Sequence, residues 1–568
     1  MNVARLLALY EQVAEAPNAI GCLRRFVLDL AVRGWLVAQN ADDEPASELL
    51  KQIEKTRRTA AAGTKRSSTA LKPTPFGGEL YPTPSGWEWA ALAAVSDVTM
   101  GQSPPGSTYN TSGEGVPLIN GPVEFTAGPF GRTVVNQFTT APTNFCAEGD
   151  LLICVRGSTT GRTNIAAFKA CIGRGVAAIR SAFEDEFIRL FLWKSREDII
   201  AMGRGIAFPS VTKKQLENLA IPLPPLAEQR RIVAKVEELM ALLDRLEAAR
   251  AAREATRERL TTASLNRLTA PESTPEEFPS HARFALHALP ALSTRPDQIK
   301  SLRQTILNLA VRGKLVEQNP NDEPASELLK RIAAEKTRLE KGGEIKVRKT
   351  NARERIEPLH FSLPTGWDLT ELGDVALKIT DGAHKTPTYV EKGVPFVSVK
   401  DFSAGKLDLS NTRFIPEGEH KVLYQRCDPR RGDILLGRIG TLGKPVLVDT
   451  DMEFSLFVSV GLIRFDHRNL LPEFFRLLLN SPFVGAEFDR IKIGGGTHTN
   501  KLNLGDLHTV ALPLPPLAEQ HRIVAKVDAL MALCDRLEAA LATSDTTKQR
   551  LLEALLREAL EPTLKEAA

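Results

Sequence analysis

The sequence predicts an α+β protein in which two mixed α/β domains are separated by long antiparallel coiled-coil helices. Three observations support this fold class. Long segments of the first half return almost unchanged in the second half, they have the heptad spacing of packed helices, and the stretches between them are rich in short strand-like runs. We therefore expect an internal repeat with a pseudo-two-fold relation.

The repeat is visible in two pairs of segments. AVRGWLVAQNADDEPASELLKQI begins at Ala31 and AVRGKLVEQNPNDEPASELLKRI begins at Ala310, whereas PLPPLAEQRRIVAKV begins at Pro222 and PLPPLAEQHRIVAKV begins at Pro513. The stretches in between have little in common. The second is 11 residues longer, because the offset grows from 280 at the SGW and TGW tripeptides to 291 at the prolines. Constant frames around different inserts indicate two similar modules with different tasks.

Helices are expected throughout the constant frames. Prolines disfavour helix immediately before Leu226 and Leu517, so two long helices should begin there. Shorter helices should end near Gly34 and Gly313, and others should begin at the DEPASELL motifs. We expect the apolar seams of these helices to pack against one another. The seams contain Ile232, Val236, Leu239, Leu243 and Leu246; Ile523, Val527, Leu530, Cys534, Leu537 and Leu541; and, in the shorter helices, Leu23, Val27, Leu30, Leu302, Ile306 and Leu309.

The inserts are expected to form mixed α/β domains. They hold β-branched or aromatic runs such as LFVSVGLIRF and helical stretches such as PEFFRLLLNSPFVGAEF, broken by Gly, Pro and Asn. The predicted organisation is an N-terminal helical region at 1–65, a first variable domain at 66–225, a central helical region at 226–345, a second variable domain at 346–515 and a C-terminal helix at 516–568. The central region is divided into a helix at 226–268, a linker at 269–294 and helices at 295–345.

Composition narrows the class of protein. The 568 residues include 43% hydrophobic and 25% charged residues, with a net charge of +4 that is compatible with nucleic-acid binding but does not demonstrate it. No apolar run reaches the length of a membrane span. The six cysteines form no C-x-x-C pair, so we expect a reduced cytoplasmic protein without a structural metal.

Motifs that could carry chemistry are incomplete. GRGVAA at Gly173 fits a loose dinucleotide pattern but has no clear helix after it, and GRIGTLGKP at Gly437 has the wrong spacing for a phosphate loop. SPPG at Ser103 lacks the aromatic residue that the S-P-P-aromatic motif of amino-methyltransferases would supply. We therefore expect neither a catalytic residue nor a cofactor in this chain.

The segments resemble the specificity (S) subunits of type I restriction–modification systems, and the resemblance covers essentially the whole chain. It rests on the doubled PLPPLAEQ-x-RIVAKV, on the doubled AVRG-x-LV-x-QN-x-x-DEPASELL, and on DGAHKTP and GDILLGRIGTLGK in the second insert. The first insert departs from the last two motifs and has GQSPPGS and VRGSTTG in their places.

The resemblance implies a non-catalytic subunit that determines DNA specificity. Each insert would be a target recognition domain that reads one half of a bipartite asymmetric site in double-stranded DNA. The helices would set the spacer and dock two modification (methyltransferase) subunits, which use S-adenosylmethionine to methylate adenine N6 after flipping the base. Restriction (endonuclease/translocase) subunits would add cleavage that depends on ATP and Mg.

Polar and basic side chains in the glycine-rich loops of both inserts have the chemistry that base edges and phosphates require. For each of them, a solvated loop residue or a local turn bond is an equally good interpretation, whereas Gly432, Asp433, Gly440 and Gly443 fit turns better than contacts. The candidate DNA-binding residues are Gln102, Ser103, Tyr109, Asn110, Arg156, Thr160, Arg162 and Lys213 in the first insert, and His384, Lys385, Thr386, Tyr389, Lys400, Arg438, Lys444, His498 and Lys501 in the second.

Two other functions are open at this point. An enzyme fused to its own recognition domains would need a cofactor motif, and the motifs found in the sequence are incomplete. A stand-alone DNA-binding scaffold or regulator could use the same modules without a modification partner, although the intact frames favour a partner.

Overall fold

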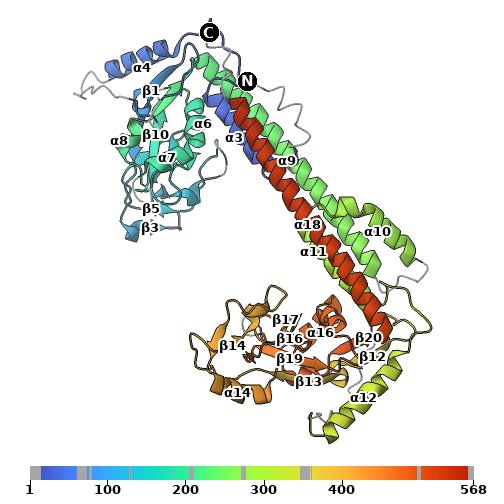
Figure 1. Cartoon of the computed structure of the whole chain (residues 1–568). Helices are drawn as coiled ribbons and strands as arrows, with labels where there is room; N and C mark the ends of the chain where they lie inside the picture. The colour runs from blue at the N-terminus through green and yellow to red at the C-terminus, as the bar shows by residue number, and fades with distance from the viewer. Residues whose placement is uncertain are drawn as a thin grey trace. The chain divides into compact units, whose positions relative to one another are not determined.

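The computed structural model describes residues 14–60, 73–75, 80–126, 128, 131–181, 183–203, 210–269, 277–345, 359, 361–495 and 500–560. The chain divides into two units, one formed by residues 1–252 and 545–568 and the other by residues 253–544. Both units share the two longest helices, α9 (Leu226–Thr269) and α18 (Leu517–Leu560), labelled in Figure 1.

The frame helices begin and end where the sequence indicates. Helices α9 and α18 start directly after their proline pairs, and α3 and α11 end just before Gly34 and Gly313. These glycines have φ values of 73° and 66°, and a Cβ on Gly313 would lie 2.3 Å from the ring of Pro364, so glycine is required there. The shorter frame helices are α3 (Ala19–Val32), α4 (Ala46–Ala60), α11 (Pro296–Val311) and α12 (Ala325–Lys341).

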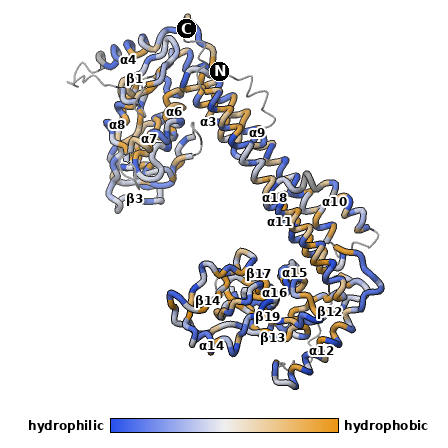
Figure 2. The backbone as a smooth tube through the Cα atoms, viewed as in Figure 1, coloured by the Kyte–Doolittle hydropathy of each residue, from blue (hydrophilic) through white to orange (hydrophobic). Residues whose placement is uncertain are grey.

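Each predicted seam finds partners within its own unit. Ile232 and Val236 of α9 are fully buried in a cluster that includes Val27 of α3. Ile523 and Val527 of α18 are buried in the cluster that contains α11. Hydrophobic and hydrophilic residues alternate around both long helices in Figure 2, as a seam with a solvated face requires.

Helix α10 (Phe278–Leu292) occupies most of the segment that the sequence predicts to be a linker. The prolines near the start of this segment suggest a loop. Pro279, however, lies in the first turn of α10, where a proline is compatible with a helix. Its Phe278 and Ala285 pack against Leu265 and Leu268 of α9 and against Leu309 of α11. Tertiary packing therefore stabilises a helix that the local sequence signals weakly.

Both variable domains contain a four-stranded antiparallel sheet with the same connectivity. The strand orders are β2-β10-β7-β8 and β13-β19-β16-β17. The inner strands are almost entirely apolar and buried, as expected for strands covered on both faces. The strands are β2 (Ser96–Met100), β7 (Leu151–Cys154), β8 (Thr163–Ile165), β10 (Val176–Ser181), β13 (Ala376–Asp381), β16 (Ile434–Gly437), β17 (Gly443–Leu447) and β19 (Val460–Phe465).

A two-stranded sheet joins the two ends of each variable domain. Strand β1 (Glu88–Ala91) pairs with β11 (Ala220–Leu223), and β12 (Asp368–Glu371) pairs with β20 (Ala511–Leu514). The entry and exit of each insert are therefore side by side, immediately before the long helix begins. The helices inside the inserts are α5 (Leu92–Val95), α6 (Glu186–Lys194), α7 (Arg196–Met202), α8 (Lys213–Glu217), α13 (Leu372–Val375), α14 (Glu417–Arg426), α15 (Pro472–Leu479), α16 (Pro482–Ile491) and α17 (Leu504–Leu507).

The two domains differ in their smaller sheets. The first has the order β3-β5-β4-β9-β6 and the second has the order β15-β14-β18. In Figure 1, β3 and β5 lie at the end of the first domain away from β1, and β14 and α14 lie at the end of the second domain away from β20. These strands are β3 (Tyr109–Asn110), β4 (Val116–Ile119), β5 (Phe138–Thr139), β6 (Phe145–Cys146), β9 (Ala170–Ile172), β14 (Val394–Val397), β15 (Arg413–Ile415) and β18 (Ser455–Leu456).

The predicted fold class is confirmed. The chain contains two mixed helix–strand domains with a long helix between them in the sequence. The five region boundaries drawn from the sequence stay a prediction.

A buried glutamate at the start of α9 ties the insert to the frame. Glu228 is 1% exposed, and its two carboxylate oxygens accept hydrogen bonds from Trp87 Nε1 at 3.0 Å and from Gln39 Nε2 at 2.7 Å. Beside it, Arg231 forms an ion pair with Asp43 at 2.5 Å. We call Glu228 with Trp87 and Gln39 the first glutamate anchor.

The second unit repeats the arrangement. Glu519 is 1% exposed and accepts hydrogen bonds from Trp367 Nε1 at 3.0 Å and from Gln318 Nε2 at 2.9 Å. Arg522 pairs with Asp322 at 2.6 Å. Burial raises the pKa of this glutamate, as it does in the first anchor. Glu519, Trp367 and Gln318 form the second glutamate anchor, and the repeated motifs PLPPLAEQ, TGW and QN thereby receive a common physical explanation.

We expect Glu519→Ala to lower the free energy of unfolding by about 2–4 kcal/mol, because the indole and the amide would lose their buried acceptor. Urea unfolding followed by tryptophan fluorescence would measure this loss. Glu327→Ala is the matched control, since it removes a carboxylate of an exposed pair with Lys330 and should change stability by less than about 0.5 kcal/mol. Equal losses in the two variants would contradict the anchor.

Candidate nucleic-acid interface

Equivalent loops follow the first strand of each four-stranded sheet. Residues 101–108 follow β2 and contain GQSPPGS, and residues 382–393 follow β13 and contain GAHKTP, which comes directly after Asp381. Because the two sheets have the same strand order, both loops leave the same edge of the same scaffold. Loops on a rigid sheet are common locations for binding residues.

The second loop is fixed at its base. Ala383 N donates to the carbonyl of Leu456 at 2.7 Å, and Val458 N donates to the carbonyl of Ala383 at 3.0 Å. A Cβ on Gly382 would lie 1.9 Å from the Leu456 oxygen, so only glycine permits this close approach. Farther along, Thr388 N donates to the Glu419 carboxylate of α14 at 3.1 Å. Three predicted residues are exposed between these attachments, namely His384, Lys385 and Thr386.

Tyr389 provides an aromatic surface beside this loop tip. It is 40% exposed, and its ring stands edge-on to Phe396 with centroids 6.1 Å apart. The guanidinium of Arg413, on β15, lies 4.6 Å from the centre of the tyrosine ring. The pair combines a π surface with a positive charge, which suits contact with nucleic acid.

A buried carboxylate lies where β13 ends. Asp381 is fully buried and accepts a hydrogen bond from Arg438 Nη1 at 2.6 Å. Arg438 is only 5% exposed, and it also donates to the carbonyls of Leu502 at 3.1 Å and Val458 at 3.0 Å. Burial lowers the pKa of the Arg438 guanidinium, while the carboxylate acts in the opposite direction. Arg438 therefore supports the loops from inside rather than from their surface.

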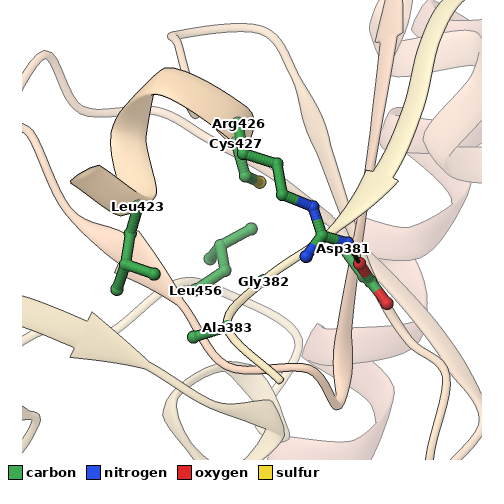
Figure 3. A pocket seen from close by; sticks show the side chains of 7 residues that line it. All are labelled: Asp381, Gly382, Ala383, Leu423, Arg426, Cys427 and Leu456. Carbon is green, nitrogen blue, oxygen red and sulfur yellow. Dashed lines mark hydrogen bonds and ion pairs between the residues drawn. The ribbon is translucent and has the colours of Figure 1, made fainter. Parts of the chain in front are cut away.

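Two exposed side chains reach the same carboxylate from the other side. Arg426 Nη2 donates to Asp381, and His384 Nε2 lies 3.0 Å from Asp381. Figure 3 shows Arg426 descending from the end of α14 toward Asp381. The guanidinium borders a small pocket with a largely apolar lining. That pocket is lined by Asp381, Gly382, Ala383, Leu423, Arg426, Cys427 and Leu456.

The other predicted residues of the second domain occupy separate loops. Lys400 is exposed, with its amine 3.9 Å from Asp401. Lys444 is exposed and has a left-handed backbone with φ of 53°, and Lys501 is exposed on a segment paired with Ile493. His498 lies outside the described residues. The turn interpretation of Gly432, Gly440 and Gly443 agrees with their φ values of 87°, 76° and 76°, and Asp433 is buried against Arg464.

The first domain builds its loop from different contacts. Gln102 N donates to the carbonyl of Ile172 at 2.9 Å, and Arg174 N donates to Ser103 Oγ at 3.1 Å. A Cβ on Gly101 would lie 2.2 Å from a backbone oxygen of the turn at 173–175. These bonds bring the exposed side chains of Gln102 and Arg174 to one loop cluster.

Several predicted residues of the first domain make local bonds. Tyr109 donates from its hydroxyl to the Pro104 carbonyl at 3.2 Å, and Asn110 donates to the Glu114 carbonyl at 2.9 Å. Thr160 is fully buried and donates to the Gly157 carbonyl at 2.7 Å, which is a turn bond. The remaining three keep solvent-facing side chains: Arg156 is exposed, Arg162 is half-buried, and Lys213 is exposed 3.6 Å from Glu217.

Sequence reasoning missed four groups near these loops. Arg174 stands inside GRGVAA, a segment considered only as a cofactor motif. Arg413 and Arg426 lie in stretches without a recognisable motif, and the motif DGAHKTP does not indicate that its Asp381 is a buried acceptor. Three of the four are arginines, but only Arg174 lies in a loop, whereas Arg413 is on β15 and Arg426 ends α14.

A family model for the type I restriction modification DNA specificity domain matches residues 84–253 and 364–543, which together are more than half of the chain. The chain belongs to this family. Both matches begin just before a glutamate-anchor tryptophan and end inside a long helix, so each contains one complete variable domain.

Curated specificity subunits are similar over almost the whole chain. The type I restriction enzyme EcoAI specificity subunit of Escherichia coli is 31% identical over 94% of this chain and 92% of its own length. The EcoEI specificity subunit of Escherichia coli is 30% identical, over 95% and 93%. A crystal structure of the HsdS subunit from Thermoanaerobacter tengcongensis is 34% identical over 44% of this chain and 51% of its own, with a TM-score of 0.27. The family assignment rests on the family model and on the EcoAI and EcoEI specificity subunits.

The described part of the specificity subunit contains neither a candidate metal site nor a candidate membrane span. No group of three His, Cys, Asp or Glu side chains there could hold a metal ion. No helix among the same residues is sufficiently long and apolar to cross a membrane.

Asp428, two residues beyond Arg426, anchors the end of α14 and gives a pH-dependent test. It pairs with Lys378 at 2.6 Å and with Arg464 at 3.2 Å. Burial acts to raise its pKa, but these ion pairs outweigh burial and lower the pKa to about 2.

Because this pKa is depressed in the folded state, Asp428 should contribute about 2 kcal/mol of stability above its ordinary pKa, and this contribution should be lost as the pH falls toward 2. Urea unfolding at a series of pH values should therefore show a shallower acid loss for Asp428→Asn than for the unmodified chain. Asp451→Asn, which removes an exposed pair with Arg431, serves as control and should follow the unmodified curve closely. Parallel curves for all three proteins would contradict this role.

Proposed function

We propose that this specificity subunit directs a type I restriction–modification complex to a bipartite asymmetric DNA site, with each variable domain reading one half. The observation that carries the proposal is the combination of one shared scaffold with two different sets of loops. The sheets have the same strand order and the glutamate anchors match bond for bond. The loops differ in sequence and in contacts, as two readers of different base sequences must.

The long helices act in this proposal as the spacer. Direct readout by two modules requires a fixed separation and a fixed rotation along the duplex. Helices α9 and α18 both contribute residues to each unit, and in this proposal their length sets the separation of the variable domains. The outer faces of these helices would dock two modification subunits.

The chemistry belongs to partner subunits in the cytoplasm. The modification subunits would bring S-adenosylmethionine and methylate adenine N6, and restriction subunits with ATP and Mg would cleave double-stranded DNA. This chain contributes sequence recognition through its exposed loop residues. We propose contacts for Gln102, Arg156, Arg162 and Lys213 in the first domain, and for His384, Lys385, Thr386, Tyr389, Lys400, Lys444, His498 and Lys501 in the second.

Replacement of residues 87–221 with the corresponding segment of a relative tests this division of labour. The exchanged segment begins with Trp87 of the first anchor and ends before α9, so the frame helices and Glu228 are preserved. We expect the methylated motif to change in one half only, with the spacer length and the other half unchanged. Methylation mapping in a host without its own adenine methylation would read the motif. A motif altered in both halves would contradict independent reading.

A further inference from the structure

The ion pair between Asp381 and Arg438 belongs to the second domain alone. Asp381 is the last residue of β13 and pairs with Gly461 of β19, while the equivalent last residue of β2 is Met100, paired with Ala177 of β10. Arg438 directly follows β16, and the residue that directly follows β7 is Val155.

Met100 and Val155 both pack in the apolar core of the first domain. The shared sheet therefore folds with an apolar pair at these two positions. Buried ion pairs commonly give no more stability than well-packed apolar residues. The charged pair Asp381–Arg438 therefore points to a task that is specific to the second domain.

Arg426 contacts Asp381 from its solvent side and indicates what this task is. Arg426 is the last residue of α14, and its side chain is 54% exposed while its Nη2 donates to the buried carboxylate. The residues that follow fix the backbone, since Cys427 is buried and Asp428 makes the ion pairs described above. Between β5 and β6 of the first domain, the described residues contain no helix corresponding to α14. Both Arg426 and its support are thus features of one domain.

The guanidinium of Arg426 has N–H donors that are available to a ligand. Arginine carries five N–H donors in a planar fork, and the bond to Asp381 uses one of them. His384 Nε2 lies 3.2 Å from the same Nη2 atom. Among the described residues, no acceptor is bonded to Nε or Nη1 of Arg426. A guanidinium held at one corner by a buried carboxylate is oriented before its ligand arrives, so little side-chain entropy is lost on binding.

Resting on the proposed function, we propose that Arg426 reads a guanine in the half-site of the second domain and that Asp381 is its positioning residue. The N7 and O6 atoms of guanine offer two adjacent acceptors in the major groove, and an arginine fork matches them. A phosphate also accepts an arginine fork, but phosphate contacts carry no sequence information. A support restricted to one of two readers fits base recognition better than a contact that both would need.

The test uses the purified complex of the full chain with its modification subunits. Once the methylated motif is known, duplexes with each of the four base pairs at every position of the second half-site are compared by their methylation rates. Arg426→Ala should reduce the preference for one guanine by roughly 10- to 100-fold and leave the first half-site unchanged. Arg431→Ala, which removes another exposed arginine of the same segment, should keep the full preference.

Two outcomes would overturn the inference. An unchanged preference in Arg426→Ala would show that this side chain does not read a base. A uniform loss on all duplexes, with a salt dependence weakened by about one phosphate contact, would assign Arg426 to the DNA backbone. Absence of any bipartite motif with the unmodified complex would instead contradict the proposed function itself.

The double variant Asp381→Met with Arg438→Val tests the positioning role without leaving a buried charge unpaired. It installs the pair that the first domain carries, so we expect the sheet to fold, and thermal melting measures the cost of losing the Arg438 bonds to Leu502 and Val458. We expect it to lose the same guanine preference as Arg426→Ala while keeping every other position of the motif. Full retention of the preference would show that Asp381 does not position Arg426.

Discussion

The buried glutamate at the start of each long helix is the constraint on which the rest of the molecule depends. Glu228 and Glu519 each accept hydrogen bonds from a tryptophan that stands beside the first strand of the insert and from a glutamine of the preceding frame segment. A carboxylate removed from water must find donors, and these three segments supply them. One side chain thereby fixes the frame, the entry of the insert and the start of the helix relative to each other within each unit.

This constraint explains how the two halves can differ so widely and still share a fold. With β1 paired to β11 and β12 paired to β20, each insert begins and ends at the same place on its frame. Between those points the two inserts share the four-stranded sheet but differ in their smaller sheets and in their loops. One such difference is the ion pair Asp381–Arg438 of the second domain, because the first domain has apolar side chains at the equivalent positions.

The frames were predictable from the sequence because their signals are local. Prolines before Leu226 and Leu517 and glycines at Gly34 and Gly313 act on their immediate neighbours, so the helix limits follow directly. Interactions between distant residues left weaker traces. Helix α10 depends on packing against Leu265 and Leu268, and the Asp381–Arg438–Arg426 cluster unites three segments far apart in the chain. The glycines that the loop turns require could be recognised in the sequence. The roles of Arg413 and Arg426 could not, because they depend on contacts with residues far away in the chain.

Methylation mapping of a methylation-free host tests most directly the claim that this chain supplies specificity to a partner's chemistry. The host would express this chain with a modification (methyltransferase) subunit from the same genome, and each of the two alone. The account predicts adenine methylation only when both are present, at a split motif with two different halves. Methylation by this chain alone would contradict the account, because it would reveal an active site within the chain. An assembled complex that methylates nothing would contradict it equally and favour a scaffold or regulator.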